Sequence, residues 1–205
     1  YGGGAIAGVV NFISKMPKEE LEADFMFNQS HIGQTNIGAY VSQKKGKFGF
    51  SFLGLGNLQK AYDVDKDDFS ELPRSKNFTI NPRLFFYPNA SLSIMLGNSY
   101  TWGYNVGGDM EKIKESGNAL HTYFEENRTV RNTTTLEIDK KFKSGNKLKL
   151  KQSLGLFDRV ITLPTYAFSG FNTNSFTDLS LLVNQRKHTV IAGINLVYDK
   201  FNHRN

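Results

Sequence analysis

The sequence predicts an all-β fold, and more narrowly part of an antiparallel transmembrane β-barrel with about nine strands. Apolar and polar residues alternate with a period of two along most of the chain, which is the pattern of strands that have one apolar face. Aromatic residues make up 13% of the 205 residues, and 19 glycines stand beside only 5 prolines, as expected for many strands joined by turns. The connections between the alternating segments also vary in length in a regular way.

The alternating segments define the expected strands. In the clearest segment, Leu148, Leu150 and Leu154 share one side of a strand, while Lys149 and Lys151 share the other. The nine expected strands lie near residues 22–30, 37–44, 47–58, 77–87, 90–104, 128–142, 147–160, 176–185 and 188–200. Several are much longer than the strands of about 5–6 residues that are usual in soluble proteins, which favours a membrane barrel over a soluble sandwich.

The connections are expected to be short and long in turn. Tight turns are predicted at residues 44–46, 87–90, 143–146 and 185–188, and longer polar loops at about 59–76, 105–127 and 161–175. Apart from a brief first connection near 31–36, the short connections would then lie at one end of the sheet and the long loops at the other, as in outer-membrane barrels with short periplasmic turns and long extracellular loops. Tyr100, Trp102 and Tyr104 fall at the loop end of their strand, where an aromatic girdle would meet lipid headgroups.

Charge and cysteine content exclude several function classes. The net charge is +6, but the 25 lysines and arginines are scattered among turns and form no stripe, so no nucleic-acid partner is expected. The chain has no cysteine, which excludes disulfides, thiolate metal sites and cysteine nucleophiles. The first residues have neither the basic nor the apolar region of a signal peptide, and there is no run of about 18 apolar residues.

The opening segment, residues 1–17, is rich in glycine. Gly2, Gly4 and Ala7 fit the spacing of a dinucleotide-binding fingerprint. That fingerprint must open a helix, whereas residues 8–13 form a β-branched and aromatic run that predicts a strand. A nucleotide-binding loop is therefore excluded.

The same segment closely resembles the C-terminal end of the plug domain in TonB-dependent outer-membrane receptors. In that family a Tyr-Gly pair, a stretch of small residues, a Gly-Val-Val/Ile-Asn run and a Ser/Thr-Lys/Arg pair lead into the barrel. The matching positions in this chain are Tyr1, Gly2, Gly8, Val9, Val10, Asn11, Ser14 and Lys15. Phe12 and Pro17 resemble the ferric-citrate branch of the family more than the glycan-importing branch.

The resemblance implies a domain division and a cellular setting. Residues 1–20 would be the end of the plug and residues 21–205 the N-terminal part of a barrel of about 22 strands. The first strand would start at the periplasmic side of the outer membrane of a Gram-negative bacterium. The implied partners are the outer-membrane lipid, a small iron complex as ligand, and the TonB energy-transducing complex, which would bind an N-terminal segment outside this sequence. The fragment alone is not expected to transport.

The implied function is uptake of a scarce nutrient, and a ferric siderophore or ferric citrate-like complex is the first expectation. An anionic chelate calls for cations and aromatics near the outer mouth of the barrel. The candidate ligand contacts are Arg74, Tyr104, His121, Tyr123, Arg128 and Arg159. Arg83 and Arg131 are expected to face the lumen and pair with plug carboxylates.

No catalytic residue, cofactor or metal site is assigned. The four histidines are far apart and fit no metal motif, and no serine lies in a nucleophile elbow. Asp63, Asp65, Asp67 and Asp68 could suggest calcium, but Lys66 interrupts them and there is no Gly and closing Glu at EF-hand spacing. The alternatives that remain open are a glycan, haem or cobalamin importer of the same fold, and a soluble β-sandwich or adhesin module without a transport role.

Overall fold

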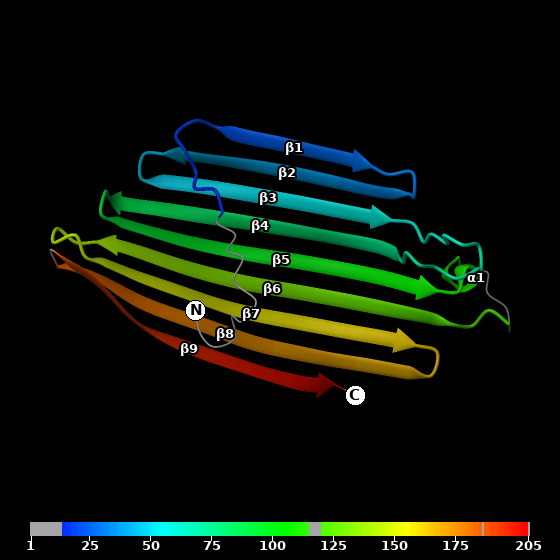
Figure 1. The fold of residues 1–205 in the computed structure, drawn as a ribbon. Coiled ribbons are helices and arrows are strands. Elements are labelled where there is room, and N and C mark those ends of the chain that lie inside the picture. The colour runs from blue at the N-terminus through cyan, green and yellow to red at the C-terminus, as the bar shows by residue number, and fades with distance from the viewer. Residues whose placement is uncertain (1–13, 115–119, 186, 205) are drawn as a thin grey trace.

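The protein forms a single antiparallel sheet of nine strands, each paired with its neighbours along the chain in the order β1 to β9 (Figure 1). The computed structural model describes residues 14–114, 120–185 and 187–204. The prediction of an all-β fold is confirmed. Within the described residues the sheet is open, with β1 and β9 at opposite edges, so a closed barrel is not seen.

All nine expected strands are present, and most extend further than predicted. The elements are β1 Glu22–Gln29, β2 Gln34–Lys45, β3 Phe48–Gln59, β4 Arg74–Asn89, β5 Leu92–Gly108, α1 Met110–Ile113, β6 Phe124–Lys141, β7 Lys147–Leu163, β8 Tyr166–Gln185 and β9 His188–Arg204. Glycines with positive φ occupy two of the tight turns, Gly46 at 60° and Gly145 at 83°, a conformation that glycine adopts without a steric penalty. Among the described residues, no helix has the length and hydropathy needed to cross a membrane.

One predicted long loop is wrong. The expected loop 161–175 is instead the end of β7 and the first half of β8, whose pairing continues to Leu163 and Tyr166 across a two-residue turn. The segment is rich in Gly, Asn, Ser and Thr, which favour turns when taken alone. Here the hydrogen bonds of two neighbouring strands outweigh that local preference. The other two long connections are shorter than predicted, since β5 and β6 extend into the second of them, but they remain irregular outside α1.

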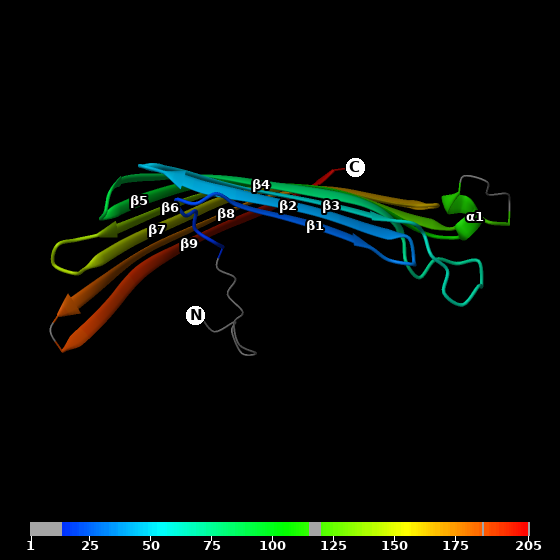
Figure 2. The same cartoon turned by 90° about the horizontal axis from the view of Figure 1, so that it is seen from above.

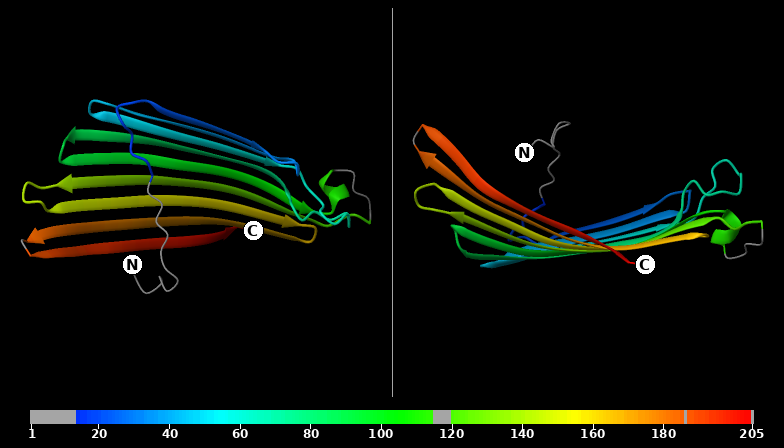
Figure 3. Two further views of the ribbon diagram at one scale, coloured as in Figure 1. Left: turned by 45° about the horizontal axis from the view of Figure 1, so that its top comes forward. Right: turned by 90° about the horizontal axis from the view of Figure 1, so that it is seen from below.

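The sheet is curved, and the segment before β1 crosses its concave side (Figures 2 and 3). We call this side the inner face. The segment lies close against it, because Pro17 Cγ is 2.9 Å from the point that a Cβ of Gly49 would occupy. At the edge of the sheet, the Lys44 N–H donates to the Lys18 carbonyl at 2.6 Å. Ser14 and Lys15 share a pocket with Asp24 and other inner-face residues. Strand periodicity then assigns alternate residues of every strand to the inner face.

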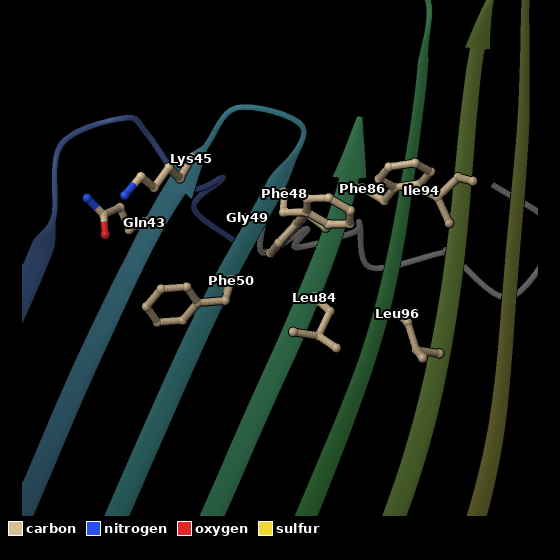
Figure 4. A pocket seen from close by; sticks show the side chains of 10 residues that line it. Gln43, Lys45, Phe48, Gly49, Phe50, Leu84, Phe86, Ile94 and Leu96 are labelled. Atoms are coloured by element: carbon tan, nitrogen blue, oxygen red, sulfur yellow. The ribbon is translucent and has the colours of Figure 1, made fainter. Parts of the chain in front are cut away.

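The opposite, outer face is largely uncovered and mostly apolar, apart from a polar patch in its middle, where Asn98 donates to Asn132 and Thr134, and Gln152 donates to Ser175. Phe25 on β1 is 74% exposed and Ile194 on β9 is 63% exposed. On β3 to β5, apolar side chains project from the same side and border a shallow groove of about 480 Å³ (Figure 4). Only Phe85, Val106 and Ile113 are buried hydrophobic residues in the described part of the chain. The sheet therefore has an apolar surface but scarcely any core of its own.

Candidate functional site

Of the residues that carry the resemblance, only Ser14 and Lys15 are among the described residues, and the predicted plug-motif residues lie outside them. The plug-motif residues are Tyr1, Gly2, Gly8, Val9 and Asn11. The described chain begins at Ser14, and the short stretch from there to β1 lies on the inner face. The six candidate ligand contacts can be placed, and they fall into three separate groups.

The first group, Arg74, Tyr104 and Arg128, lies on the outer face at the loop end of β4, β5 and β6. The Arg128 guanidinium lies 5.5 Å from the centre of the Tyr104 ring, and Arg128 Nε donates to Glu126 Oε1 at 2.7 Å. The Tyr104 hydroxyl donates to the other oxygen of Glu126 at 3.0 Å. Arg74 and Tyr104 line a cleft of about 290 Å³ together with Lys112 of α1. These cations therefore do not point to the concave side that a lumen would occupy.

The second group, Tyr123 and Arg159, lies on the inner face. Tyr123 lines a pocket of about 380 Å³ with Asn105 and Asn127, whose positions pair in register on β5 and β6. Arg159 Nε donates to Asn127 Oδ1 at 3.2 Å, which joins this arginine to the same pocket wall. Both candidates are therefore placed where a ligand on the concave side could meet them.

The third group is His121 alone, which pairs with Asp109 at the start of α1. His121 Nδ1 lies 2.7 Å from Asp109 Oδ2, and the other Asp109 oxygen accepts the N–H groups of Glu111 and Lys112 as the helix N-cap. The hydrogen bond to Asp109 raises the pKa of His121 above its ordinary value. Burial acts to raise the pKa of Asp109, but the hydrogen bonds from His121 and the two backbone N–H groups outweigh it and lower the pKa. This histidine holds a loop together.

The two arginines predicted to face the lumen both lie on the inner face. Arg83 Nε donates to Asn81 Oδ1 at 2.9 Å, and the Arg131 guanidinium lies 4.7 Å from the centre of the Phe157 ring. At the turn end of the same face, Lys149 Nζ lies 3.3 Å from Asp139 and 3.8 Å from Glu137. A pocket of about 580 Å³ over this charged group is also lined by Ser14 and Met16 of the entering segment. The predicted pairing of Arg83 and Arg131 with plug carboxylates stays a prediction.

A row of asparagines crosses the loop-end half of the inner face, and the sequence analysis missed it. Asn28, Asn36, Asn57 and Asn77 are paired in register on β1 to β4. Three of the four amides donate to the preceding asparagine of the row, at 3.4 Å from Asn36 to Asn28, 2.6 Å from Asn57 to Asn36 and 3.3 Å from Asn77 to Asn57. The row has no sequence motif, because its members are joined only by the strand register.

Four carboxylates gather in the loop between β3 and β4. Oxygens of Asp63, Asp65, Asp67 and Glu71 lie within 4.8 Å of one another, a set that could hold a cation. No metal was expected here, because Lys66 interrupts the aspartates and EF-hand spacing is missing; the fourth carboxylate, Glu71, is brought back to them by the pairing of Tyr62 with Leu72. Burial and the neighbouring carboxylates raise the pKa of Asp65. Because each carboxylate also accepts backbone N–H groups, the cluster by itself assigns no ion.

On the inner face, the described residues present amides, hydroxyls and dispersed charges, and Ser93 lies opposite Asp139 in register. Comparison with known proteins adds no identification, since no family model, curated protein or solved structure matches the chain.

Proposed function

We propose that the chain is the N-terminal part of the barrel of a TonB-dependent outer-membrane receptor, which takes up a scarce nutrient. The observation that carries the proposal is a long-stranded, curved sheet whose uncovered convex face is mostly apolar, with one polar patch on β5 to β8, and whose concave face is more polar. A soluble sheet turns its apolar side into a core. A transmembrane barrel turns it to lipid and keeps its polar side for the lumen.

The turn-end edge of the apolar band supports a membrane setting. On the outer face the band is closed by Gln43 on β2, in register with Leu96 of β5. On β6 the band is closed by Lys140, in register with Leu92 of β5. The row of paired residues through Lys140 continues to β9, where the band is closed by His188, four residues further toward the turn end. The edge thus descends by roughly eight residues over seven strands. With a rise of about 3.4 Å per residue and a strand spacing of about 4.8 Å, this is an inclination of roughly 40°.

The loop-end edge is inclined in the same direction. It runs from Lys76 and Arg128, both in register with Tyr104 of β5, to Lys200 on β9, in register with Tyr100. A drop of four residues over the five strands from β4 to β9 corresponds to roughly 30°. Strands of membrane barrels are tilted by about 35–45°. When the strands are tilted by this angle, both edges of the apolar band run parallel to the membrane plane. Both edges are therefore consistent with a single lipid bilayer.

The inner face supports a plug and a ligand in the same lumen. The segment before β1 lies against it near its charged, turn-end half, which is the periplasmic half under this proposal. The loop-end half carries Arg159 and Tyr123, the cation and aromatic that a ferric siderophore or ferric citrate-like complex would meet. An iron complex is therefore the first ligand class, and the plug would release it when the TonB complex acts.

The asparagine row favours a second ligand class, a neutral glycan. Within the row each amide keeps hydrogen-bonding capacity beyond its neighbour contacts. Asn77 Oδ1 and Thr129 Oγ1 lie 2.7 Å and 2.8 Å from the point that a Cβ of Gly103 would occupy, so that the glycine leaves room for both. A neutral amide and hydroxyl surface matches sugar hydroxyls better than it matches an anionic chelate.

Extraction of the full-length protein tests the membrane proposal. The protein is expected to require detergent for extraction and to migrate differently on gels before and after heating, because a closed barrel resists unfolding in mild detergent. Partition into buffer without detergent, together with heat-independent migration, would leave the soluble sandwich or adhesin module as the better explanation.

Calorimetry of the same preparation separates the ligand classes. Ferric citrate is expected to bind, with loss of affinity in Arg159→Gln, whereas Lys200→Gln on the outer face serves as the matched control. If a panel of neutral oligosaccharides binds and ferric citrate does not, the iron hypothesis fails and the glycan class replaces it.

A further inference from the structure

We infer that the outer-face cleft between β4, β5, β6 and α1 binds the phosphate of a lipid headgroup. The inference rests on the proposed membrane setting and goes beyond it, because it assigns a specific anion site to residues Arg74, Lys112 and Arg128. Two of these residues had been candidates for ligand contact in a lumen, and their position on the convex face gives them a different partner.

The cleft is lined by cations and by one aromatic ring. Arg74, Tyr104 and Lys112 line a volume of about 290 Å³, and Arg128 lies over the Tyr104 ring at its rim. Glu126 is the only carboxylate among the lining residues, and it already accepts Arg128 Nε and the Tyr104 hydroxyl. Three cations against one carboxylate leave an excess of positive charge in the cleft.

Arg74 provides the observation that points to a missing anion. Its Nε atom is buried and has no hydrogen-bond partner among the described residues. A buried N–H of a charged group without an acceptor is costly, and native structures rarely leave one unpaired. A guanidinium presents its N–H groups in a planar fork that matches the oxygens of a phosphate. The Nε atom itself is closed to solvent, so an anionic oxygen in the cleft would meet the remaining N–H groups of the same guanidinium, which makes no ion pair among the described residues.

The level of the cleft identifies the source of that phosphate. Tyr104 stands in register with Lys76 and Arg128, the polar residues that close the apolar band at its loop end. Trp102, one step toward the middle of the band, lies 6.5 Å from the Tyr104 ring. Aromatic residues at a band edge mark the headgroup level of a bilayer. The cleft therefore opens sideways at the depth of lipid phosphates, so a lipid headgroup rather than free phosphate is its occupant.

The test uses the full-length protein in phosphatidylcholine nanodiscs that contain a minor fraction of phosphatidic acid, with retained lipid counted by native mass spectrometry. The double variant Arg74→Gln/Lys112→Gln is expected to retain phosphatidic acid about ten-fold more weakly than the unmodified protein, as expected for lost charge-assisted hydrogen bonds. Lys200→Gln, which removes an outer-face cation far from the cleft, is the matched control and should retain it fully.

Each outcome has one meaning. Equal retention by the double variant and the unmodified protein overturns the inference. If the protein in phosphatidylcholine nanodiscs retains inorganic phosphate as well as it retains phosphatidic acid, a lipid headgroup is not the specific source of the phosphate. Failure of the unmodified protein to enter nanodiscs at all contradicts the membrane proposal instead, and is recognised before any lipid is counted.

Discussion

A single charge placed on β9 distinguishes a lipid-facing sheet from a water-facing one. Ile194 is the middle of five outward apolar residues on this strand, from Val190 to Tyr198, and it is 63% exposed. If the outer face meets lipid, Ile194→Arg puts a charge near the bilayer midplane, which costs about 2–4 kcal/mol in membrane barrels. If that face meets water, a change at so exposed a site should stay within about 0.5 kcal/mol.

The neighbouring residue provides the control. Asn195 points to the inner face, where it pairs in register with Asp178, so Asn195→Arg should be neutral or slightly favourable. The assay is guanidinium titration of the full-length protein folded in bilayers, followed by tryptophan fluorescence and gel mobility. The expected difference between the two variants is roughly 30-fold to 700-fold in the unfolding constant. Equal effects at the two positions would refute the assignment of the outer face to lipid.

Three further predictions concern the loop and the inner face. The pKa of His121 is raised, so its ion pair with Asp109 stabilises the α1 loop at pH values below the ordinary histidine pKa. This stability is lost as the pH rises through the raised pKa. Asp109→Asn should keep the helix cap but abolish the pH dependence of proteolysis in this loop. Gly108→Ala, at φ +120° with its Cβ 2.8 Å from a backbone oxygen, should cost more than about 1 kcal/mol in denaturant titration, whereas Gly56→Ala, with no atom within 4 Å, should cost less. Asn57→Leu, which removes two amide hydrogen bonds, should lower the unfolding free energy by about 1–3 kcal/mol without altering secondary structure by circular dichroism.

Strand existence could be predicted from the sequence, because alternation with a period of two is a local property. The alternation from Leu148 to Leu154 correctly predicted the first half of β7. The ends could not be predicted, because residues 166–175 consist largely of turn-forming types and become a strand only through pairing with β7. Strand ends depend on partners far along the chain.

The candidate site illustrates a second limit. Arg128 and Arg131 are three residues apart on β6, so they must point to opposite faces, and the sequence alone contains that information. The sequence analysis grouped candidates by nearness to a loop instead of by parity, which placed Arg74 and Arg128 with Arg159. The asparagine row could not have been found in either way, because Asn28, Asn36, Asn57 and Asn77 are aligned only by register.

The same alternation separates three chemistries on one sheet. Apolar residues and the outer cations lie on one side, while the charged group around Lys149 and the amide row share the other at opposite ends. A shift of one residue in the register of β6 would turn Arg128 inward and Arg131 outward, because side chains alternate along a strand. Such a slip would place Arg131 in the apolar band and move Arg128 away from the cleft at the band edge. The slip would also turn every outward apolar side chain of the strand to the inner face, which costs free energy at each of them. A long strand therefore keeps one register.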